Sequence, residues 1–157
     1  MLGKVCLTLT GNTREDWSRR LAAERRWIDL VEMRIDLLKP SERGVEDIAR
    51  WWARERSSSD VPGVLTIRRS GDLGRWEGDE AQRLFLLGRL LDALGPEYVD
   101  IELDRAGLSG WDQLAARVRE NGGTVIRSHH EPRYTPADLP GLMARFSSDT
   151  QEIPKLA

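Results

Sequence analysis

Short apolar runs alternate with longer amphipathic segments along the whole chain. The short runs predict six β-strands, at residues 5–9, 28–38, 62–67, 98–103, 124–130 and 153–156. The longer segments have apolar residues at helical spacing and predict helices over residues 13–25, 45–56, 80–94 and 111–120, with an irregular helix after Thr135-Pro136. Strands that alternate with helices in this way are typical of an α/β protein with a parallel sheet.

Two architectures fit this alternation. An open doubly wound sheet suits a chain of 157 residues, whereas a (β/α)8 barrel needs roughly 250 residues and eight strands. The charges within the strands favour the barrel. In residues 31–37 the residues Glu32, Arg34 and Asp36 alternate with apolar ones, and residues 98–104 repeat this pattern with acidic side chains.

Helices cover both faces of an open parallel sheet, so the charged face of these strands would be buried there at a cost of several kcal/mol, about the effective penalty for an unpaired ion. In a barrel, the apolar face packs on the outer helices and the charged face points into the lumen near the C-terminal mouth. We therefore expect an incomplete (β/α)8 TIM-type barrel. About six of its eight βα units would form a single partial domain over residues 1–157.

Composition narrows the class of protein. Charged residues make up 32% of the chain and the net charge is −2, which indicates a globular protein without the positive field that attracts nucleic acid or an anionic membrane. The single cysteine, Cys6, excludes an intrachain disulfide and a cysteine-based zinc site, and its apolar surroundings predict a buried structural thiol. No segment is long enough to span a bilayer, so we expect a cytoplasmic protein.

Two residues are candidates for chemistry. His130 ends the strand at residues 124–130, at the edge where parallel sheets bind ligands, and alternation places it on the same face as Ser128. Taken alone, a histidine at a strand end is more often structural. In the last strand, aliphatic neighbours and nearby cations would disfavour the charged form of Lys155 and leave the free amine that attacks a carbonyl. Taken alone, it would be a solvated lysine.

Several runs resemble type I 3-dehydroquinate dehydratase of the shikimate pathway, in the family's order and at about its spacing. The resemblance extends over nearly the whole chain, while the chain covers only part of the family's barrel. The runs are residues 31–37, residues 65–68, Glu77-Gly78, residues 99–103, Ser128-His129-His130 with Thr135-Pro136 after it, and residues 154–157.

The resemblance implies that this enzyme, a hydro-lyase, acts through a lysine Schiff base. Lys155 would form an imine with the ketone of 3-dehydroquinate, and His130 would serve as general base and then general acid. Glu77 would orient the histidine. The substrate-binding residues implied are Thr8, Glu32, Met33, Arg34 and Arg68. No metal or organic cofactor is implied, because the lysine itself supplies the electron sink.

The chain also departs from the family. His129 stands where the family usually has an aromatic residue, and the sequence ends just after Lys155, before the seventh and eighth strands. We therefore expect this chain by itself to be unstable or nearly inactive. We expect the full-length gene to encode a homodimer or a fusion to shikimate dehydrogenase. Two other functions stay open: another Schiff-base barrel such as a class I aldolase, and a catalytically dead barrel fragment that serves as a scaffold.

Overall fold

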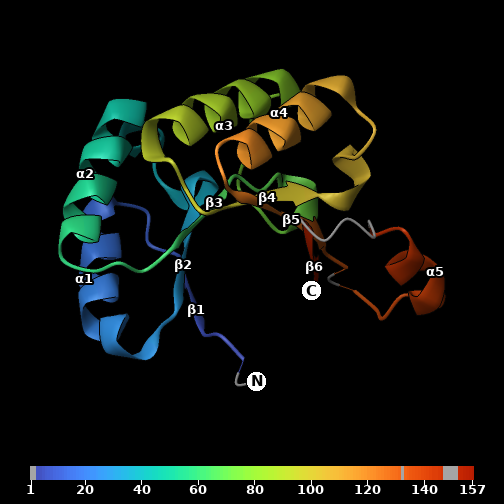
Figure 1. Ribbon diagram of the computed structural model, residues 1–157, viewed down its shortest axis with the longest axis horizontal. Helices are drawn as coiled ribbons and strands as arrows, with labels where there is room; N and C mark the ends of the chain where they lie inside the picture. The colour runs from blue at the N-terminus through green and yellow to red at the C-terminus, as the bar shows by residue number, and fades with distance from the viewer. Residues whose placement is uncertain (1–2, 132, 147–151) are drawn as a thin grey trace.

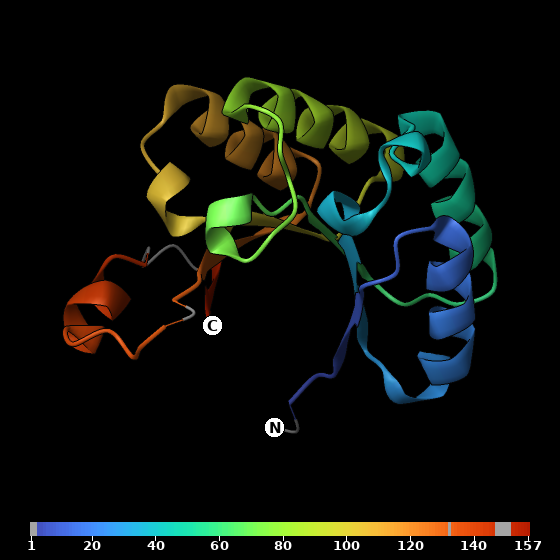
Figure 2. The same ribbon diagram turned by 180° about the vertical axis from the view of Figure 1, so that it is seen from behind.

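Six parallel strands form one curved sheet, and their order in the sheet follows the chain from β1 to β6. This computed structural model describes residues 3–131, 133–146 and 152–157. The strands are β1 (Cys6–Leu9), β2 (Leu30–Arg34), β3 (Gly63–Thr66), β4 (Tyr98–Glu102), β5 (Thr124–His129) and β6 (Glu152–Leu156). The sheet bends into an arc with helices along its convex side, and β1 and β6 are its two edge strands (Figures 1 and 2).

Helices connect successive strands, and some of them begin at a residue whose side chain caps the first turn. The helices are α1 (Arg14–Glu24), α2 (Val45–Ser57), α3 (Glu80–Leu94), α4 (Ser109–Glu120) and α5 (Leu139–Ala144). The Thr13 side chain accepts the Asp16 N–H at the start of α1, and Asp79 and Gln82 form a capping box at the start of α3. Helix α3 ends at Gly95, whose φ of +53° suits glycine. The prediction of an incomplete barrel with parallel strands is confirmed.

Tight turns follow several strands and place side chains at the C-terminal edge of the sheet. They are the 3-10 segments η2 (Ile35–Leu37), η4 (Ser70–Asp72) and η5 (Leu103–Arg105), while η1 (Arg25–Trp27) and η3 (Pro40–Glu42) lie elsewhere. The predicted strand at residues 28–38 was therefore too long. The chain leaves the extended conformation after Arg34 because the Asp36 carboxylate turns back to accept hydrogen bonds from the Arg34 guanidinium.

The hydrophobic core lies between the convex face of the sheet and the helices. Outward-facing strand residues, among them Leu9, Val31 and Leu65, are buried together with the helix residues Trp17 and Trp51. Period-2 alternation produces this division, since the intervening strand residues face the concave side.

Two predictions were wrong at this level. Met33, predicted to bind substrate, is fully buried in the core on the opposite face from Glu32. Cys6, predicted to be a buried thiol, is exposed because β1 is an edge strand of the described sheet. Among the described helices, none combines the length and the apolar character that crossing a bilayer requires.

Gly63 tests how tightly the core packs behind β3. A methyl group at this position would lie 2.7 Å from Cζ2 of Trp52 and 3.1 Å from Cε of Met33, both in the core. We expect Gly63→Ala to lower the free energy of unfolding by about 1–3 kcal/mol through overpacking, as measured by urea denaturation. Gly71→Ala is the matched control because a methyl group added there would have nothing within 4 Å, and equal losses in both variants would contradict this account.

Candidate active site

Four charged side chains, three on strands and one just after a strand, meet on the concave face. The Nζ atom of Lys155, on β6, lies 3.0 Å from Oδ2 of Asp100 on β4 and 3.4 Å from Oε1 of Glu32 on β2. Nη2 of Arg68, which follows β3, lies 3.0 Å and 3.7 Å from the same two oxygens. Two cations therefore share two carboxylates. This pairing offsets the free energy that it costs to remove the charges from water. Three of the side chains are almost completely buried, while that of Lys155 is 32% exposed.

Hydroxyl groups complete the hydrogen bonding of the two carboxylates. Thr8 and Thr66 donate to Glu32 at 2.7 Å and 2.9 Å, and Ser128 donates to Asp100. Burial acts to raise the pKa of Glu32, but Lys155, the Thr8 hydroxyl and Arg68 outweigh it, so the pKa is lowered. The Glu32 carboxylate is therefore ionised at neutral pH and can accept hydrogen bonds from a polyhydroxylated ligand.

His130 lies directly after β5, whose Ser128 is paired in register with Lys155 of β6. Neither ring nitrogen of His130 has a hydrogen-bond partner among the described residues. Burial and the cations Arg68 and Lys155 together lower its pKa from 6.5 to about 4, and they outweigh the opposing charges of Asp100 and Asp72. The imidazole is therefore neutral at pH 7 and can accept a proton.

The surroundings of Lys155 differ in part from the expectation. A cation was expected near Lys155. Arg68 is this cation, since Arg68 and Lys155 both contact Asp100 and Glu32. The expected enclosure does not occur, since the Lys155 side chain is 32% exposed and its amine contacts carboxylate oxygens. The amine therefore lies in an ion-paired setting.

The loop after β3 brings a different carboxylate towards His130 than the one expected. Glu77 is exposed and does not hydrogen-bond the imidazole. Asp72 instead lines a cavity of about 150 Å³ together with His129 and His130, and its charge acts on the pKa of His130. Asp72 was not among the predicted site residues, because an irregular loop has no periodicity that reveals which side chain points inward.

Asp100 was also absent from the predicted site residues, although it contacts Lys155 directly. Its position opposite the apolar residues of β4 was a usable signal. Of the predicted residues, Lys155, Arg68 and Thr8 thus each contact Glu32 directly. Arg34 lies at the end of the same strand as Glu32, where its Nε and Nη2 donate to Asp36 at 2.9 Å and 2.8 Å.

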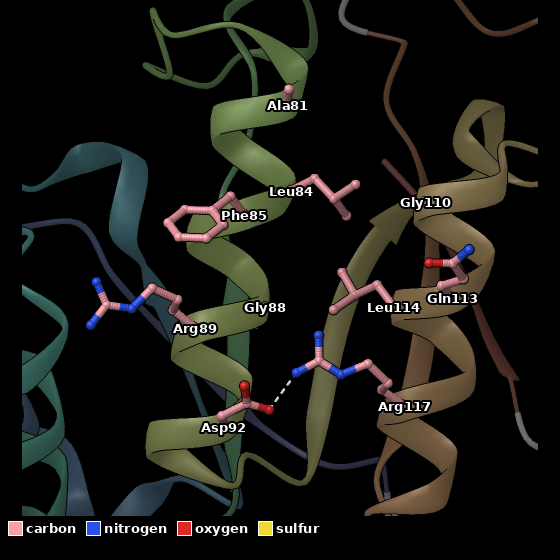
Figure 3. A pocket seen from close by; sticks show the side chains of 10 residues that line it. All are labelled: Ala81, Leu84, Phe85, Gly88, Arg89, Asp92, Gly110, Gln113, Leu114 and Arg117. Carbon is pink, nitrogen blue, oxygen red and sulfur yellow. Dashed lines mark hydrogen bonds and ion pairs between the residues drawn. The ribbon is translucent and has the colours of Figure 1, made fainter.

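A second hollow, on the convex side of the sheet, does not offer comparable chemistry. A hollow of about 420 Å³ lies between α3 and α4 on the convex side, lined by Leu84, Phe85 and Leu114, and its acidic residue Asp92 is paired with Arg117 (Figure 3). It lacks a histidine, cysteine or lysine that could act as a base or nucleophile. Among the described residues, no group of three or more His, Cys, Asp or Glu side chains is arranged to hold a metal ion.

Comparison with known proteins gives a consistent result. A family model described as type I 3-dehydroquinase matches residues 5–157. The chain is 41% identical over 110 residues to a 3-dehydroquinate dehydratase of Methanosarcina barkeri, covering 69% of this chain and 44% of that protein. It is 35% identical over 131 residues to the bifunctional 3-dehydroquinate dehydratase/shikimate dehydrogenase of Arabidopsis thaliana, covering 82% of this chain and 20% of that protein. The chain thus spans about half the length, or less, of these relatives.

Solved structures support the fold. The 3-dehydroquinate dehydratase from Geobacillus kaustophilus superposes with a TM-score of 0.80 at 19% identity, covering 99% of this chain and 62% of that one. The enzyme from Aquifex aeolicus gives a TM-score of 0.77 at 25% identity, with coverages of 99% and 66%.

The lowered pKa of His130 predicts a pH-dependent stability. The imidazole has a pKa of about 4 when folded and 6.5 as its reference value, so the unfolded chain binds more protons between these values. Stability is therefore lost as the pH falls from 6.5 towards 4, by about 1 kcal/mol between pH 7 and pH 5 once solvent screening of this partly buried ring is allowed for. In urea unfolding at both pH values, His130→Gln should reduce this loss and His129→Gln should not. If the His130 variant lost as much stability between pH 7 and pH 5 as the wild type, the loss could not be attributed to His130.

Proposed function

The chain belongs to the type I 3-dehydroquinase family, and on that premise we propose that its protein dehydrates 3-dehydroquinate to 3-dehydroshikimate in the shikimate pathway. One observation supports this most directly. A lysine lies among charged groups on the concave face, and the neighbouring strand is followed by a neutral imidazole that has no hydrogen-bond partner among the described residues. Such a pair supplies both a nucleophile for a ketone and a base for the adjacent carbon.

The reaction begins when the amine of Lys155 attacks the ketone carbon and water leaves, which forms an iminium. Asp100, 3.0 Å from Nζ, is the nearest group that can take the ammonium proton before the attack. The iminium withdraws electrons from the neighbouring carbon, so His130 can remove a proton there and generate an enamine. The enamine expels a hydroxyl group, which takes the proton back from His130 and departs as water. Hydrolysis of the imine then releases the product and restores the lysine.

The other predicted residues would hold the substrate. Glu32, Arg34 and Arg68 would bind its hydroxyl groups, and Thr8 would line the site beside Glu32, to which it donates a hydrogen bond. In this proposal Glu77 reaches the site only if the loop of residues 69–78 moves, whereas Asp72 already lines the cavity next to His130. The lysine serves as the electron sink, so the reaction needs no organic cofactor or metal.

The assembly and location belong to the same proposal. A homodimer, or a fusion to shikimate dehydrogenase, is the expected form of the full-length protein, and the names of the Arabidopsis thaliana and S. pombe proteins pair these two activities in one chain. We also propose a cytoplasmic location without nucleic-acid or membrane partners, which the net charge of −2 supports.

Borohydride trapping tests the Schiff base. The protein is incubated with 3-dehydroquinate, reduced and digested, and the adduct is located by mass spectrometry. We expect it on Lys155, because this amine lies beside the charged groups that would bind the substrate. The chain has two other lysines, so Lys39→Ala is the matched control and should still be labelled, whereas Lys155→Ala should not. An adduct on Lys4 or Lys39 alone, or none in a chain extended to complete the barrel, would refute the proposal.

Replacing His130 and His129 one at a time tests which of the two histidines is the catalytic base. His130→Ala should lower kcat by about 10²–10⁴, the usual contribution of general acid–base catalysis, yet still permit imine trapping. His129→Ala should have a much smaller effect on kcat, because alternation along β5 places the His129 side chain on the opposite face from Ser128. Steady-state kinetics on both variants would decide, and the reverse order of effects would assign the base to His129. A class I aldolase or an inactive scaffold would give no turnover of 3-dehydroquinate in either case.

A further inference from the structure

Asp36 is a buried carboxylate with both oxygens fully engaged. Oδ1 accepts hydrogen bonds from Nε of Arg34 at 2.9 Å and from the backbone N–H of Arg68 at 3.1 Å. Oδ2 accepts from Nη2 of Arg34 at 2.8 Å and from the backbone N–H of Arg75 at 3.0 Å. The residue is 0% exposed. It therefore has no surface with which to touch a substrate.

These four hydrogen bonds join three separate parts of the C-terminal edge of the sheet. Arg34 is the last residue of β2 and is proposed to bind a substrate hydroxyl group. Arg68 follows β3, and Arg75 lies in the loop of residues 69–78. The Asp36 carbonyl adds a fourth link, because it accepts from Nη2 of Arg43 at 2.8 Å, and the Arg43 guanidinium lies 5.6 Å from the ring centroid of Trp76 in the same loop.

The chemistry of these contacts makes the carboxylate hard to replace. A planar guanidinium and a carboxylate match in a two-point interaction that fixes both distance and orientation. The two backbone N–H groups belong to residues that lie 32 and 39 positions away, so the same charge also determines where the loop begins and where it returns. Hydrogen bonds from backbone N–H groups to a buried carboxylate are charge-assisted and strong.

We propose that Asp36 is a positioning residue that presets the Arg34 guanidinium for the substrate and ties the loop of residues 69–78 to the same point. The part that concerns substrate rests on the proposed function, and the part that concerns the loop does not. Because one carboxylate holds both, the orientation of Arg34 and the order of the loop that contains Asp72 are coupled.

Hydrogen exchange tests the loop without any need for activity. In Asp36→Asn the amide nitrogen cannot accept, so one of the two backbone N–H groups loses its acceptor. We expect exchange at Arg68 or Arg75 to speed up about tenfold or more. Asp104→Asn is the matched control, since Asp104 pairs with Arg69 of the same loop but contacts neither amide, and it should leave both rates unchanged. Equal rates in wild type and Asp36→Asn would overturn the proposal.

A second measurement remains if Asp36→Asn does not fold. In the wild-type chain the Arg75 amide should exchange at least about 100-fold more slowly than that of Glu77, for which the described residues provide no acceptor. Similar rates at the two positions would overturn the link between Asp36 and the loop.

The proposed effect of Asp36 on substrate binding through Arg34 is tested by the concentration of 3-dehydroquinate that half-saturates imine trapping. Asp36→Asn should raise it about tenfold or more, whereas in an Arg34→Met background the same change should add little, since the effect passes through Arg34. An equal rise in both backgrounds would overturn the positioning role. Absence of trapping in the wild type would refute the proposed function, and the exchange rates would then decide the loop link by themselves.

Discussion

The structure depends on placing ionised groups in a poorly solvated concave face without leaving any of them unpaired. Glu32 and Asp100 face inward from β2 and β4, and they are neutralised by Arg68, just after β3, and by Lys155 on β6. Loss of one member of such a cluster leaves an uncompensated buried charge, which typically costs about 3–5 kcal/mol. The four side chains therefore depend on one another, and through them so do the strands that hold them.

The alternation of side chains along the strands makes this arrangement possible. Apolar residues such as Val31 and Ile101 face the helices, and the charged residues between them face the interior of the arc. An open sheet with helices on both faces would bury these charges against apolar side chains. The curvature that leaves the concave side free of helices removes this conflict, and it collects the polar residues of successive strands at one edge (Figure 1).

A second layer of groups lies above the strands, in the turns that follow them. Asp36 orders the end of β2 and the loop after β3, while Asp72 and Asp104 both pair with Arg69. Asp72, Asp104 and Arg69 line the same cavity as His130. The imidazole of His130 stays neutral because burial and neighbouring cations oppose its protonation. The concave face thus combines an ion-paired lysine with an uncharged base, a pairing that suits proton removal next to an imine.

The sequence by itself determined the order of the elements, the apolar and charged faces of the strands, and the residues that resemble a known family. Alternation was enough to place Glu32 apart from Met33, and cap residues were enough to begin α1 and α3, because these features depend on neighbours a few positions away. Only the tertiary structure decided that Lys155 contacts two carboxylates, that Asp72 rather than Glu77 approaches His130, and that Cys6 is exposed. Lys155 and Glu32 are separated by 123 positions, and such a contact depends on the register and curvature of the whole sheet, which no local pattern of residues encodes.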